Sequence, residues 1–85
     1  MAEWRMSMVN VVIEKIWITN GDTLTTEERQ KKIIPVKNEE IALDFVHETM
    51  KWRRVLDEVL GVSTSFALKK EDNNIILKMF VLEED

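Results

Sequence analysis

The longest regular pattern of hydrophobic and polar positions runs from Asn38 to Gly61, and it predicts an α-helix. Asn38 is a favourable N-cap, and Glu39 and Glu40 would lie at the positive end of the helix dipole. Gly61 follows Leu60 and can adopt the left-handed conformation that ends many helices. No Gly or Pro interrupts the segment between these ends, so one continuous helix is expected.

Most apolar residues of this helix fall within an arc of about 80° when successive residues are placed 100° apart. This stripe consists of Ile41, Phe45, Thr49, Trp52, Leu56 and Val59, with Ala42, Val55 and Leu60 on its flanks. We expect the stripe to face the protein core. The pairs Arg53–Asp57 and Arg54–Glu58 have the i,i+4 spacing of helical ion pairs and are expected on the solvent side.

A second, smaller apolar row lies on the side of the helix away from the stripe. Leu43, Val46 and Met50 fall within about 60° of one another. A single helix packed on one sheet does not need this row, so it predicts a surface for a partner.

The segments before the helix predict a β-hairpin. Val and Ile dominate the first strand, from Met8 to about Ile18, as is usual for strands. The Asn20-Gly21-Asp22 segment suits a type I′ turn, because Asn and Gly both tolerate positive φ.

Residues 25–32 leave two alternatives. Thr25 and Glu28 have the spacing of a capping box, which would start a short helix. We favour a second strand instead, because residues 25–32 offer a helix nothing apolar to bury. This strand is expected to become buried at Ile33, Ile34 and Val36, and Pro35 argues for an edge position.

A second hairpin is predicted after the helix, with a strand over residues 62–70, a polar turn over 71–74 and a strand over 75–82. Only Lys78 interrupts the apolar character of the last strand. A strand that is apolar on both sides is normally covered on both sides, whereas one helix covers one face of a sheet. This strand is therefore a second indication of a partner.

The order of elements predicts an α+β fold of the β-β-α-β-β type, with two β-hairpins flanking one long helix. We expect a four-stranded, mainly antiparallel sheet with the helix on one face. Residues 1–85 would form a single domain, with a loose lead-in at 1–7 and an acidic tail at 83–85.

Composition favours self-association. A chain of 85 residues has a thin core, yet 45% of its residues are hydrophobic and no Cys is present to brace it. Oligomerisation is a common way to cover surplus apolar surface, so we prefer a homodimer to a well-packed monomer.

Charge and segment composition narrow the classes of function. The net charge of −4 excludes a basic footprint over the whole surface, as nucleic-acid-binding domains often have. The N-terminus lacks the apolar core of a signal peptide, and no run of residues is long and apolar enough to span a membrane. We expect a cytoplasmic protein with no membrane association.

The inventory for catalysis is poor, with one His, no Cys and no Tyr. Asp44 and His47 lie one helical turn apart and could form half of a metal site completed by a second copy. We prefer a solvent-exposed His, and we expect no catalytic residues, no cofactor and no metal. Gly21 and Gly61 are the only glycines, so no glycine-rich phosphate loop exists.

The expected function is therefore protein–protein interaction, as an accessory, regulatory or inhibitor protein that binds itself and an unidentified protein partner. The analogy is with small inhibitor or adaptor proteins, such as those of phages and other mobile elements. The expected interface residues are Trp17, Leu43, Val46, Met50, Ile76 and Phe80.

The alternative is a nucleic-acid-binding protein. Its candidate contacts are the basic residues Lys31, Lys32, Lys37, Arg53 and Arg54. Trp52 lies beside the two arginines and could stack on a base, but its place in the stripe predicts burial in the core.

Overall fold

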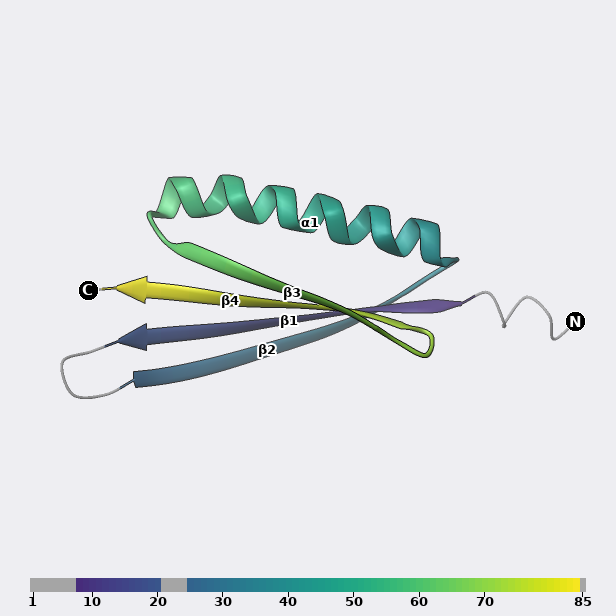
Figure 1. The fold of residues 1–85 in the computed structure, drawn as a ribbon, viewed down its shortest axis with the longest axis horizontal. Helices are drawn as coiled ribbons and strands as arrows, with labels where there is room; N and C mark the ends of the chain where they lie inside the picture. Colours follow the sequence, from purple (N-terminus) through teal and green to yellow (C-terminus); the bar gives the residue numbers. More distant parts are fainter. Residues whose placement is uncertain (1–7, 21–24, 85) are drawn as a thin grey trace, which may run out of the picture.

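The structure is a computed structural model that describes residues 8–20 and 25–84, and its elements occur in the predicted β-β-α-β-β order (Figure 1). They are β1 (Val9–Asn20), β2 (Thr25–Val36), α1 (Glu39–Leu60), β3 (Ser63–Glu71) and β4 (Asn74–Glu84). Residues 25–32 belong to a strand, as favoured above. The predicted lead-in at 1–7, and Gly21 and Asp22 of the predicted turn, lie outside the described residues.

The four strands form one sheet in the order β2-β1-β4-β3. β1 pairs antiparallel with β2, and β3 pairs antiparallel with β4, so both predicted hairpins are confirmed. The two hairpins join through a parallel pairing of β1 with β4. The two most apolar strands therefore occupy the centre, and Pro35 lies on the edge strand β2, where its missing N–H group breaks no central ladder.

Both ends of α1 are fixed as the sequence predicts. The Oδ1 atom of Asn38 accepts a hydrogen bond from the backbone N–H of Ile41 at 2.9 Å. Gly61 has φ of +70°, and its N–H donates to the carbonyl oxygen of Asp57 at 2.8 Å. These contacts satisfy backbone groups that every helix end leaves without a partner inside the helix.

The core lies between α1 and the face of the sheet beneath it. Figure 1 shows α1 running alongside the twisted sheet. The buried cluster consists of Val11, Ala42, Val46, Ile75, Leu77 and Met79, and it is flanked by the partly buried Val9, Ile13, Ile34, Val36, Leu43, Met50 and Phe66.

The side of α1 that packs on the sheet differs from the prediction. Val46 is fully buried, and Leu43 and Met50 pack against the core cluster, so the row expected to face away from the sheet contributes to the core. The stripe that was expected to fill the core is exposed instead. Ala42 and Val46 are small, and they let α1 approach the sheet more closely than the large side chains of the stripe would allow.

No described element covers the opposite face of the sheet. Val12 and Ile16 on this face are nevertheless buried, because side chains of neighbouring strands surround them. Ile76 and Phe80 are half-buried there, whereas Ile33 is 59% exposed, contrary to its expected burial. Glu14 pairs with Lys31 and Lys78 in the strand register, and this charged row divides the apolar surface.

The hairpin formed by β3 and β4 ends in the predicted polar turn. Asp72 takes the left-handed conformation, with φ of +54°, which Asp tolerates better than most residues. Beside it, Lys69 Nζ lies 2.8 Å from Glu71 Oε2. The hydrogen bond from Lys69 lowers the pKa of Glu71, and the same bond raises the pKa of Lys69. β4 extends to Glu84, so the predicted acidic tail largely belongs to the strand.

Candidate functional site

The most unusual surface of the described structure is one side of α1. We call it the α1 stripe, and it consists of Ile41, Phe45, Thr49, Trp52, Leu56 and Val59. Its five apolar members expose between 36% and 77% of their surface, and Trp52 exposes 68%. The prediction that this stripe fills the core, and that Trp52 is buried, is therefore wrong.

The spacing of the stripe is that of a helix that packs on another helix. From Phe45 to Val59 its members are separated by four, three, four and three residues. This is the a/d pattern of a coiled-coil seam, which is narrower than the apolar arc of a helix that covers a sheet. This spacing is visible in the sequence. It indicates a surface that packs on another helix, whereas the width of the apolar arc alone does not distinguish such a surface from one that packs on a sheet.

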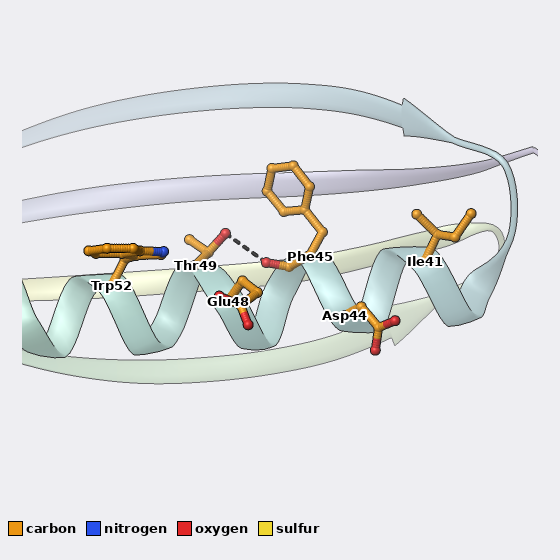
Figure 2. Close-up of a pocket in the computed structure, with 6 residues that line it drawn as sticks. All are labelled: Ile41, Asp44, Phe45, Glu48, Thr49 and Trp52. Carbon is orange, nitrogen blue, oxygen red and sulfur yellow. Dashed lines mark hydrogen bonds between the residues drawn. The ribbon is translucent and has the colours of Figure 1, made fainter.

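The N-terminal half of the stripe borders an open hollow with a volume of about 560 Å³ (Figure 2). In Figure 2 Phe45 projects from α1 toward the side where β1 and β2 lie. The hydroxyl of Thr49 donates to the carbonyl oxygen of Phe45 at 2.8 Å, so its hydrogen-bonding group is satisfied within the helix. Among the described residues that line the hollow, the ionisable ones are Asp44 and Glu48. The hollow is thus apolar with acidic side chains on its rim.

The exposed area exceeds what a monomer usually shows. The flanking residues Val55 and Leu60 are also about half exposed, and they extend the stripe. An aromatic side chain has a full area of roughly 150–250 Å² and an aliphatic one has less, so these seven apolar side chains leave up to about 700 Å² exposed. The largest apolar patch on a typical monomer measures about 300–600 Å².

A buried polar cluster lies beneath the C-terminal half of α1. Arg53 is only 7% exposed, and its Nε–H donates to Asp57 Oδ1 at 2.9 Å and to Thr64 Oγ1 at 3.1 Å. The hydroxyl of Thr64 donates to the same carboxylate oxygen at 2.7 Å. The Arg53 guanidinium also lies 5.6 Å from the centre of the Trp17 ring. The expectation that Arg53 and Asp57 lie on the solvent side is therefore wrong, because Arg53 reaches Thr64 and Trp17 on the sheet while Asp57 supplies its counter-charge.

The expected interface residues do not form one surface. Leu43, Val46 and Met50 face the sheet, and Val46 has no exposed area with which to contact a partner. Trp17 is half-buried beneath Arg53. The remaining two, Ile76 and Phe80, lie on the uncovered face of the sheet.

The basic residues are also dispersed. Arg53 belongs to the buried cluster, and the Arg54 guanidinium lies 5.7 Å from the centre of the Phe66 ring. Lys31 Nζ lies 4.0 Å from Glu14 Oε1, while Lys32 and Lys37 are exposed. Arg53 and Arg54 therefore contact different aromatic rings and do not converge on one phosphate site.

Asp44 and His47 are both exposed on α1. The prediction of a solvent-exposed His47 is therefore confirmed. Within residues 8–20 and 25–84, no three His, Cys, Asp or Glu side chains gather closely enough to hold a metal ion.

Comparison of the chain with protein-family models, with curated proteins and with solved structures gave no significant match. Over the part of the chain that the structure describes, no helix has the length and apolar character needed to cross a membrane. The argument about function therefore rests on the surface of the fold.

Proposed function

We propose that this chain is a non-enzymatic protein-binding module that acts through the α1 stripe. The observation that carries the proposal is the exposure of five large apolar side chains on one helix face. Contiguous apolar surface of this size usually marks a protein–protein contact. Trp52 stands at the middle of the stripe, and Trp is the residue type most enriched among those that dominate binding energy.

The chemistry of the chain supports a binding role. Its only His is exposed, and the hydroxyl of Thr49, which lines the hollow beside the stripe, donates to the backbone. An accessory, regulatory or inhibitory role follows if the bound partner supplies the chemistry. A cytoplasmic location is part of the same proposal, and the absence of Cys is compatible with it.

Capture of partners from the native host tests the proposal. The wild-type chain is compared with the double variant Phe45→Ala/Trp52→Ala, which removes two exposed side chains without opening the core. We expect the wild type to retain a protein that the double variant loses. Helix content measured by circular dichroism should be the same for both chains.

Ile33→Ala is the matched control, because Ile33 is equally apolar and exposed but lies on the uncovered face of the sheet. This variant should retain the partner. Loss of the partner with Ile33→Ala, together with retention by the double variant, would place the binding surface on the sheet and overturn the proposal.

The alternative prediction is nucleic-acid binding through the basic residues Lys31, Lys32 and Lys37, and its test is salt dependence. Binding through several phosphate contacts must weaken steeply as salt concentration rises. An absence of any mobility shift with DNA or RNA at low salt would remove this alternative.

A further inference from the structure

We infer that the partner of the α1 stripe is a second copy of this chain, with the two α1 helices packed antiparallel across a two-fold axis. This inference rests on the proposed function, because it identifies the protein that the binding module would bind. Two features of the stripe favour a second copy: its area and the sizes of its side chains.

The area matches that of a stable interface. Each partner in a standard protein–protein interface buries about 800 Å², and the stripe with its flanking Val55 and Leu60 exposes up to about 700 Å². The a/d spacing from Phe45 to Val59 is the pattern that packs helix on helix. One copy of the stripe therefore offers both the area and the geometry that another copy requires.

The order of side-chain sizes is self-complementary when the helices run in opposite directions. A two-fold axis between residues 50 and 51 places Thr49 opposite Trp52 of the second copy, and Phe45 opposite Leu56 of the second copy. Each layer then combines a larger side chain with a smaller one, as well-filled cores do. Because the contact is isologous, both layers occur twice.

A parallel pairing would fill the same layers unevenly. Trp52 would meet Trp52, and Thr49 would meet Thr49, so one layer would be crowded and the next underfilled.

The uncovered face of the sheet is the competing surface for a second copy. Its central residues Val12 and Ile16 are already at most 7% exposed, and the charged row at Glu14 and Lys78 divides it. A partner would gain almost no further burial from these two residues, and it would have to cover the charged row. The α1 stripe is therefore the better candidate for the interface with a second copy.

Light scattering over a wide range of concentrations gives the first test. We expect the wild type to have the mass of a dimer, and Trp52→Ala to raise the dissociation constant at least about 30-fold. Ile33→Ala should remain a dimer. A monomeric wild type at every concentration would overturn the inference, as would a dimer that Ile33→Ala dissociates and Trp52→Ala does not.

Disulfide trapping tests the direction of the helices, and the absence of native Cys makes it clean. Phe45→Cys mixed with Leu56→Cys should form a disulfide-linked heterodimer. Phe45→Cys alone should not cross-link to itself, because the two copies of residue 45 lie eleven residues, or about 16 Å, apart along the helices. His47→Cys, on another side of α1, is the control. Self-linking of Phe45→Cys without heterodimer formation would indicate parallel helices and overturn the pairing.

The outcomes also separate this inference from the proposed function. A monomeric wild type that retains a host protein through Trp52 refutes the second copy and leaves the binding module standing. If Trp52→Ala changes neither the mass nor the retained proteins, both the inference and the proposed function fail.

Discussion

Arg53 shows how a charged residue can face the sheet side of a helix in a domain this small. Its Nε–H reaches Asp57 on the same helix and Thr64 on β3, and the ring of Trp17 lies against the guanidinium. The Nη2 atom is buried without a hydrogen-bond partner within the described structure. The buried positive charge of Arg53 is therefore stabilised mainly by one carboxylate, that of Asp57.

We predict that Asp57→Ala destabilises the fold by about 3 kcal/mol, because it leaves the buried Arg53 without its counter-charge. The backbone carbonyl of Asp57, which accepts from Gly61 and Val62, is unaffected by the change. Urea denaturation measures the free energy of unfolding. Glu58→Ala is the control, since Glu58 is exposed, and it should change this value by less than about 0.5 kcal/mol.

Comparable losses for Asp57→Ala and Glu58→Ala would contradict this account of the cluster. They would show that Arg53 finds solvent or another partner as easily as it finds Asp57.

Gly61 is the second residue whose role can be isolated. Its φ of +70° is strained for residues with a Cβ, yet no atom lies within 4 Å of the position that a Cβ would occupy. Gly61→Ala should therefore cost about 1 kcal/mol through backbone conformation alone. Gly61→Asn should cost less, because Asn tolerates this conformation better. Thermal unfolding of both variants checks the prediction, and a larger loss for Asn than for Ala would contradict it.

At the scale of the element, α1 has two apolar sides with different tasks. The side with Ala42 and Val46 packs on the sheet, and the side with Phe45 and Trp52 faces solvent in the single chain. The apolar part of the sheet side is small, because this side also carries the polar Arg53 cluster.

Substitution on the two sides of α1 should therefore have different effects on folding. Val46→Ala removes two buried carbon atoms and should lower the free energy of unfolding by about 2 kcal/mol. His47→Ala, one position along and exposed, should change it by less than about 0.5 kcal/mol. If His47→Ala lowered the free energy of unfolding more than Val46→Ala, the assignment of the Val46 side of α1 to the sheet would be wrong.

At the scale of the whole molecule, one helix lies on one face of a four-stranded sheet, and both the stripe and the other sheet face lack a covering element among the described residues. A chain of this size gains stability by covering one of them. The stripe is the more exposed surface, so its association should be coupled to the stability of the fold.

This coupling predicts a thermal midpoint that depends on protein concentration. For a dimer that dissociates as it unfolds, the midpoint should rise by a few degrees with each tenfold increase in concentration. Trp52→Glu, which introduces a charge into the stripe, should remove the dependence. A midpoint of the wild type that is constant over all concentrations would contradict the coupling.

The sequence by itself determined the elements and their ends. Asn38 and Gly61 bound α1 through contacts with residues at most four positions away, and the strands of both hairpins follow from local strand patterns. Such features depend on near neighbours in the chain, so they are visible without a fold. The choice of strand for residues 25–32 was likewise correct, because a helix there would have had no apolar side to bury.

Only the tertiary structure decided which side of α1 meets the sheet. Periodicity shows that two apolar sides exist, but the shape of the sheet and the partners of Arg53 select between them. Thr64 and Trp17, which accommodate Arg53, lie 11 and 36 positions away in the chain, beyond the reach of a helical pattern. Because large side chains such as Trp52 give the stronger pattern and small ones such as Ala42 allow the closer packing, the more apolar side remained at the surface.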